Sequence, residues 1–192
     1  MAEAEASGLR PPSMSTEVLK ALSNPLRRQV WNTVIRLRYA RAADLARHLD
    51  QPANSLSFHL RVLAEAGLIE EAPEQARDKR DRVWKATRGA LSLGSPADPV
   101  HDEALGTAVL AGEVADHQAL LARVVAWAAR YVTGEDPVER GTLATYNLRL
   151  THERYASLVE EVDAVLGRYR DDEETPSTHT WTLSLVAAND EI

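Results

Sequence analysis

Two short amphipathic segments joined by a tight turn, within residues 42–66, constrain the fold of this chain more than any other feature. Apolar residues recur at three- and four-residue spacings in both, which is the pattern of a helix with one buried face. They are Leu45, Ala46 and Leu49 in the first segment and Leu56, Leu60 and Leu63 in the second. Gly67 then stands where a glycine commonly ends a helix. The pattern therefore predicts two short helices, at about 42–49 and 53–66.

The preceding residues predict two further helices. Asn24-Pro25 is a strong helix start, because the asparagine side chain can cap the first turn and proline has no N–H to leave unpaired there. The helix that follows carries its apolar residues on one stripe, namely Leu26, Val30, Val34 and Leu37. A shorter helix beginning near Ser15 and Thr16 carries Val18, Leu19 and Leu22. We expect residues 1–14 to be disordered.

After Gly67 the apolar spacing changes from helical to alternating. Residues 68–71 and 82–87 predict two short strands, and the charged residues 72–81 between them predict the loop of a hairpin. The helix that begins at Pro25, the helices at 42–49 and 53–66 and the hairpin follow one another in the order that defines a winged helix-turn-helix. With the short helix before them, we place this domain at 15–92. The predicted fold class is thus mainly α with a small β component.

The charge of the chain divides sharply between its two halves. The net charge of −7 argues at first sight against a nucleic-acid partner. Residues 10–91, however, hold 15 basic and 9 acidic side chains, whereas residues 92–192 hold 7 basic and 18 acidic ones. Such asymmetry is expected when one module faces nucleic acid and the other faces elsewhere. Double-stranded DNA is therefore the expected partner of the first half.

Polar residues on the helix predicted at 53–66 are suited to reading a DNA groove. The residues beside its leucine stripe are Asn54, Ser55, Ser57, Phe58 and Arg61. Asparagine can pair with an adenine edge, serine with a base edge or phosphate, arginine with guanine, and phenylalanine can touch a thymine methyl group. His59 fits either a phosphate contact or packing beside the leucines, and packing is the favoured interpretation.

The hairpin loop and its second strand carry four further candidate DNA contacts, Arg77, Lys79, Arg80 and Arg82. Cationic side chains on a hairpin suit contacts to phosphates or to the minor groove. Asp78 and Asp81 dilute the positive charge, so an ordinary solvated loop is the alternative interpretation.

The chain resembles the ArsR-type winged helix-turn-helix proteins over residues 15–90. The resemblance is carried by ADLARHL at 43–49, by SLSFHLRVLAEAGLI at 55–69, and by LSNPLRR at 22–28. It implies a homodimeric repressor that binds a pseudo-palindromic operator and is often released by a small ligand or a metal. A winged-helix adaptor that binds protein or a small molecule instead of DNA is the alternative function.

The second half predicts a dimerisation or effector region at 101–192, after a linker at 93–100. A long helix at about 102–132 carries an apolar stripe that we take as the main dimer seam, comprising Leu105, Val109, Gly112, Leu120, Val124, Trp127 and Tyr131. Alternating residues then predict a strand at 142–150, Thr151 caps a further helix, and a last strand is predicted at 180–185. Two strands are too few to be stable alone, so they need the long helix, the wing or the partner subunit.

Candidate small-molecule and metal sites in the second half are weaker. Five aromatic residues could line an apolar pocket for an unknown effector or could simply be core: Trp127, Tyr131, Tyr146, Tyr155 and Trp181. The chain has no cysteine, and its His-Asp and His-Glu neighbours point about 100° apart on a helix, so we expect no metal site and no cofactor.

Enzymatic and membrane functions are not indicated. The chain has neither a glycine-rich phosphate loop nor a GxSxG or HExxH motif, so we expect that it is not an enzyme. Neither a long apolar run nor a signal pattern is present, so we expect a cytoplasmic protein without membrane contact.

Overall fold

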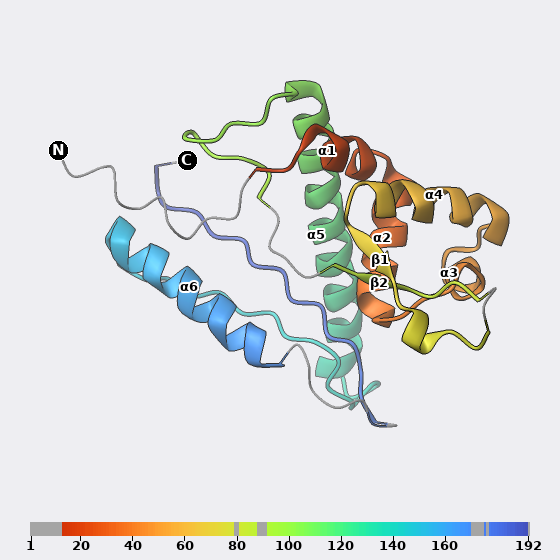
Figure 1. Ribbon diagram of the computed structural model, residues 1–192. Coiled ribbons are helices and arrows are strands. Elements are labelled where there is room, and N and C mark those ends of the chain that lie inside the picture. Colours follow the sequence, from red (N-terminus) through yellow and green to blue (C-terminus); the bar gives the residue numbers. More distant parts are fainter. Residues whose placement is uncertain (1–12, 79–80, 88–91, 170–174, 176, 192) are drawn as a thin grey trace. The chain divides into compact units, whose positions relative to one another are not determined.

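The computed structural model describes residues 13–78, 81–87, 92–169, 175 and 177–191 (Figure 1). The chain divides into two compact units, one ending at Gln118 and the other beginning at Ala119. The first unit therefore continues past the 93–100 segment and includes part of the long helix. No helix in the described part of the chain combines the length and apolar character needed to cross a membrane.

Local capping determines where the first two helices begin. The Ser15 side chain accepts a hydrogen bond from the Val18 amide (3.3 Å) and starts α1 (Thr16–Leu22). Asn24 accepts from the Arg27 amide (3.0 Å) and starts α2 (Pro25–Leu37), which has proline at its first position. Both bonds satisfy amides that the first turn leaves without a helical partner. The helix starts predicted from the sequence are confirmed.

The helix-turn-helix pair follows as α3 (Ala42–Leu49) and α4 (Ala53–Glu65). The turn between them begins at Asp50, which adopts a left-handed conformation (φ 51°). Gly67 has φ of 73°, a conformation that costs glycine little, and so lets the chain leave α4. The two predicted helices are confirmed to within one residue.

A two-stranded antiparallel hairpin completes the winged fold. β1 (Ile69–Glu71) pairs with β2 (Trp84–Ala86). The short 3-10 helix η2 (Pro73–Gln75) lies in the loop between them. Ala40 bridges to Trp84 through two backbone bonds of 2.9 Å, an addition that the sequence did not predict. The hairpin is confirmed, although both strands are shorter than expected.

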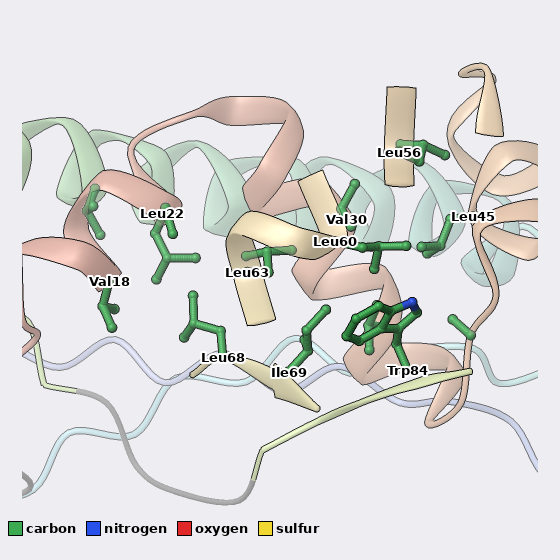
Figure 2. Packing of buried hydrophobic residues seen from close by; sticks show 14 of the residues in the cluster. Val18, Leu22, Val30, Leu45, Leu56, Leu60, Leu63, Leu68, Ile69 and Trp84 are labelled. Atoms are coloured by element: carbon green, nitrogen blue, oxygen red, sulfur yellow. The ribbon is translucent and has the colours of Figure 1, made fainter. Parts of the chain in front are cut away.

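One hydrophobic core joins these elements, and α2 lies at its centre in contact with α1, α3, α4 and β2. Figure 2 shows Leu60 of α4 between Val30 of α2 and Leu45 of α3, and Leu56 and Leu63 belong to the same buried cluster. Leu56, Leu60 and Leu63 are at most 1% exposed. The side of α4 opposite these leucines must therefore face outward.

The N-terminal end of the described chain is ordered more extensively than expected. Ser13 and Met14, which we had included in the disordered tail, bond to residues far along the chain: the Met14 amide donates to the Ser92 carbonyl (2.8 Å), and the Ser13 amide donates to the Asp98 carboxylate (2.9 Å). These bonds tie the start of the fold to the segment before the long helix.

The long helix α5 (Glu103–Val132) is anchored to α2 by a buried arginine. Arg28 is 7% exposed, its Nε donates to the Asp116 carboxylate (3.2 Å), and its guanidinium lies against Gly112. Asn32 donates to the same carboxylate (3.0 Å). A buried cation needs such partners, because desolvation would otherwise be costly.

This anchoring corrects the predicted dimer seam. Val109 and Gly112 belong to the stripe that we assigned to a partner subunit, but both are buried within the first unit. The large apolar residues of α5 that remain exposed are Leu110, Val114, Leu121, Val125, Tyr131 and Val132, of which only Tyr131 belongs to the predicted stripe. The hydrophobic pattern identified a buried face but could not indicate which partner buries it.

The second unit contains the end of α5 and α6 (His152–Tyr169), but its predicted strands are not formed. Thr151 caps α6 as expected, accepting from the Arg154 amide (3.3 Å). No residue of α6 is buried. Residues 142–150 and 180–185 are not assigned as strands. Their alternation is a property of strands, but a strand also needs a neighbouring strand to bond to.

The packing at Gly112 leads to a stability prediction. Gly112→Ala adds a Cβ where the Arg28 guanidinium lies, and this buried side chain is held by Asp116, so we expect a loss of about 1–3 kcal/mol in the free energy of unfolding. Urea denaturation measures the loss. Gly167→Ala on α6 is the control: a Cβ there meets nothing within 4 Å, and alanine is the better helix former. Equal stability of Gly112→Ala and the parent would contradict this packing.

Candidate nucleic-acid interface

The outward side of α4 gathers the polar residues that the sequence selected. Asn54, Ser57 and Arg61 follow one another at spacings of three and four residues, so they share one face of the helix. All three are exposed, as are Ser55 and Phe58. The buried leucines on the other side fix the orientation of this face. We call these five residues the reading face.

Two of these side chains are already hydrogen-bonded within the helix. The side-chain Oδ1 of Asn54 accepts from the Ser55 backbone amide (2.9 Å), and the Ser57 hydroxyl donates to the Ala53 backbone carbonyl (2.9 Å). Contact with a base edge would require these weak local bonds to be exchanged. Arg61 makes no ion pair within the described part of the chain, so its guanidinium is the group best placed to bind a base or phosphate.

Phe58 and His59 form an aromatic pair on α4, with ring centroids 5.6 Å apart in an edge-to-face arrangement. Phe58 is 54% exposed, whereas His59 is half-buried and its Nδ1 has no hydrogen-bond partner among the described residues. Burial lowers the pKa of His59, and the charge on Arg27 lowers this pKa further. An uncharged, half-buried ring supports packing as the role of His59.

The wing contributes exposed cations beside the hairpin. Arg77 and Arg82 are both exposed, and Arg82 lies 3.4 Å from a carboxylate oxygen of Glu71. The other two predicted wing contacts, Lys79 and Arg80, lie outside the described residues. Of the two wing arginines that the structure describes, Arg82 is ion-paired, whereas Arg77 makes no ion pair with another described residue.

An anchor that sequence reasoning missed holds the wing to α3. The Nε of Arg41, at the start of α3, donates to both carboxylate oxygens of Asp81 (3.0 and 2.9 Å). Its Nη2 donates to the Gln75 carbonyl (3.0 Å). Asp81 in turn accepts from the Arg77 amide (3.0 Å). The loop that carries Arg77 is thus fixed relative to the helix-turn-helix.

The ionised state of the anchor is favoured by its surroundings. The hydrogen bond from the Arg77 amide and then that from the Arg41 guanidinium hold the pKa of Asp81 below its ordinary value. Asp81 therefore holds the wing loop in place. The sequence had suggested only that it reduces the positive charge of the wing. Arg41 and Asp81 are 40 positions apart in the sequence, so no local sequence pattern could have indicated that they form an ion pair.

The predicted aromatic pocket is only partly assembled in the second unit. Trp127 and Tyr131 lie together with ring centroids 4.9 Å apart, and the Trp127 indole N–H donates to the Val138 carbonyl (3.0 Å). Tyr146, Tyr155 and Trp181 are 81%, 40% and 56% exposed. An effector pocket built from these five residues stays a prediction.

A shallow hollow of about 100 Å³ lies elsewhere in the second unit, lined by Leu148, Leu150, Arg154, Leu158 and Glu161. This volume is below the roughly 300 Å³ at which pockets hold drug-sized ligands. Across the described residues, no group of three or more metal-ligating side chains is close enough to hold an ion.

Comparison with known families agrees with the geometry of the first unit. A family model described as a helix-turn-helix domain matches residues 22–72, which extend from the end of α1 to just beyond β1. No match was found among curated proteins. The chain thus carries a helix-turn-helix DNA-binding domain, and its class is that of DNA-binding transcription regulators.

The wing anchor gives the second prediction. Asp81→Ala releases the loop that carries Arg77, so we expect affinity for duplex DNA to fall roughly 3- to 10-fold, or about 0.7–1.4 kcal/mol. Fluorescence anisotropy with labelled duplexes measures the change. The exchanged pair Arg41→Asp with Asp81→Arg should recover part of the loss.

Arg130→Ala is the control, because it breaks an ion pair with Glu135 in the second unit and leaves the reading face and the wing unaltered. We expect it to leave DNA affinity unchanged. Unaltered affinity of Asp81→Ala would show that the wing does not depend on this anchor.

Proposed function

We propose that this protein is a homodimeric transcriptional repressor of the ArsR-like type that binds a pseudo-palindromic operator in the cytoplasm. In this proposal α4 enters the major groove and the wing contacts the adjacent backbone. The observation that carries the proposal is the two-sided character of α4, whose leucines are buried while its polar residues are exposed together. A helix with such an outward face matches the dimensions and chemistry of the major groove.

Charge supports DNA as the partner. The first half has a local excess of basic residues, and Arg61 and Arg77 are exposed on the reading face and the wing. Phosphate contacts supply most of the non-specific affinity of such proteins, whereas base contacts select the sequence. Arg61 is proposed to contact a base edge and Arg77 a phosphate.

A dimer is supported by the exposed apolar stripe of α5. Leu110, Leu121 and Val132 are spaced 11 residues apart, as are Val114 and Val125. Eleven residues make almost three full helical turns, so these side chains stay on one face along the helix. We propose that this stripe, rather than the face that includes Val109, packs against α5 of a second copy.

An adaptor that binds protein instead of DNA is favoured by one observation. Phe58 is large, apolar and 54% exposed at the middle of the reading face, as expected of an anchor in a protein interface. The same ring can contact a thymine methyl group, so DNA remains the proposed partner.

The two arginines are predicted to affect DNA binding differently. Arg61→Ala should weaken specific binding by about 1–3 kcal/mol and relax selection at one base position. Arg77→Ala should weaken binding to all sequences similarly. It should also reduce the slope of log affinity against log salt concentration by about one, because one phosphate contact is lost. Selection of bound genomic fragments, followed by gel shifts over a range of salt, measures both. If the double variant binds every fragment as tightly as the parent protein does, this surface is not the DNA-binding surface, and the adaptor function is favoured.

The dimer seam can be tested with a charge placed on either side of α5. Leu121→Asp puts a carboxylate into the exposed stripe, so we expect a monomer by light scattering at micromolar concentration. Ala126→Asp, about 120° around the helix from the centre of the stripe, introduces the same charge as a control and should leave the dimer intact. A parental protein that is monomeric would exclude the homodimer, and a dimeric Leu121→Asp would exclude this seam.

A further inference from the structure

The second unit contains two extended segments whose backbone has no partner in the described chain. Figure 1 draws residues 142–150 and 181–186 as long stretches without helical turns. No backbone hydrogen bond joins either segment to another described residue. Backbone N–H and C=O groups in folded proteins are nearly always paired, and a row of unpaired groups on an extended chain is a site for strand addition.

The side chains of both segments follow the pattern of half-buried strands. Tyr146, Leu148 and Leu150 alternate with Asn147 and Arg149 in the first segment. In the second, Trp181, Leu183 and Leu185 alternate with Thr182 and Ser184. Successive side chains of a strand point to opposite faces, so each segment would have one apolar and one mainly polar face, with Leu143 and Val186 as the apolar residues on the polar faces. This alternation predicts a sheet with one side covered.

The apolar face is nevertheless exposed in the single chain. Tyr146 is 81% exposed, Trp181 56%, Leu183 69% and Leu185 64%. With Leu148 and Leu150 of the same face and Tyr169 of α6, the uncovered area amounts to roughly 500–900 Å². The largest apolar patch on a typical monomer is about 300–600 Å², and a stable interface buries about 800 Å² per partner. The area is thus appropriate for a stable interface of standard size.

A second copy of this chain can both pair with the extended backbone and cover its apolar side chains. Each copy supplies two segments, which are too few for a stable sheet, whereas two copies supply four, and three or more with an apolar face suffice. Residues 119–192 hold 7 basic and 13 acidic side chains, so nucleic acid is disfavoured at this surface. The proposed dimer would also hold the segments of both copies at high effective concentration.

We propose that residues 142–150 and 181–186 of two copies pair across the dimer into one shared sheet, with its apolar side covered by the α6 helices. This inference rests on the proposed homodimer and goes beyond the α5 seam, because it assigns the second unit to a structure that forms only between subunits. The sheet of the second unit then forms only on dimerisation.

Hydrogen exchange of the full-length protein tests the shared sheet. The amides of residues 143–149 and 182–186 should be protected at micromolar concentration and should lose this protection on dilution, when the dimer dissociates. Protection that is independent of concentration would mean pairing within one chain and would overturn the proposal. Rapid exchange while light scattering still shows a dimer would also overturn it but would leave the homodimer standing.

Cysteine cross-linking gives a second, independent measurement, because the parent chain has no cysteine. Asn147→Cys and Thr182→Cys place single thiols on the polar faces of the two segments. The variants, alone and mixed after subunit exchange, should yield a disulfide-linked dimer in at least one combination. A double variant that forms only an intrachain disulfide would overturn the proposal.

Matched substitutions of neighbouring residues test the apolar face. Tyr146→Asp places a charge on that face and should abolish the protection of both segments, whereas Asn147→Asp places the same charge on the polar face and should preserve it. Retained protection in Tyr146→Asp would show that this face is not buried. A dimer held by α5 alone would survive both variants, so failure of the sheet can be distinguished from failure of the dimer.

Discussion

Burial of the leucine stripe of α4 is the interaction on which the functional surface depends. Leu56, Leu60 and Leu63 pack into the core around α2 and α3 (Figure 2), and truncating one such leucine would cost about 2–5 kcal/mol. Because a helix has a fixed rotation per residue, burying this stripe turns the reading face outward. The same hydrophobic contacts thus stabilise the domain and position the residues that we propose contact DNA.

Charge–charge contacts then set the positions of the elements around that core. Arg41 and Asp81 connect the wing loop to α3, and Arg28 and Asp116 connect α5 to α2. Both pairs join segments that are distant in the sequence, and both are supported by further hydrogen bonds. Ion pairs of this kind contribute more to orientation than to total stability. The winged domain accordingly has a hydrophobic interior and ionic connections at its edges.

The two units differ in how completely they fold as a single chain. The first unit holds nearly all of the buried residues, whereas α6 has none and many large apolar side chains of the second unit are exposed. In the proposed homodimer the second unit would become complete only on dimerisation, which suits a regulator whose DNA binding requires two copies. The acidic charge of that unit also keeps it off the DNA backbone.

The sequence by itself determined the local structure of the first unit and the composition of the reading face. Helix caps, the Gly67 turn and the leucine spacing act within a few residues, so the starts of α1, α2 and α6 and the fold class could be predicted. Only the tertiary structure decided which face of α5 is buried and that Arg41 anchors Asp81. It also left residues 142–150 outside any strand. These features depend on partners distant in the chain, and a hydrophobic period specifies a face without specifying its partner.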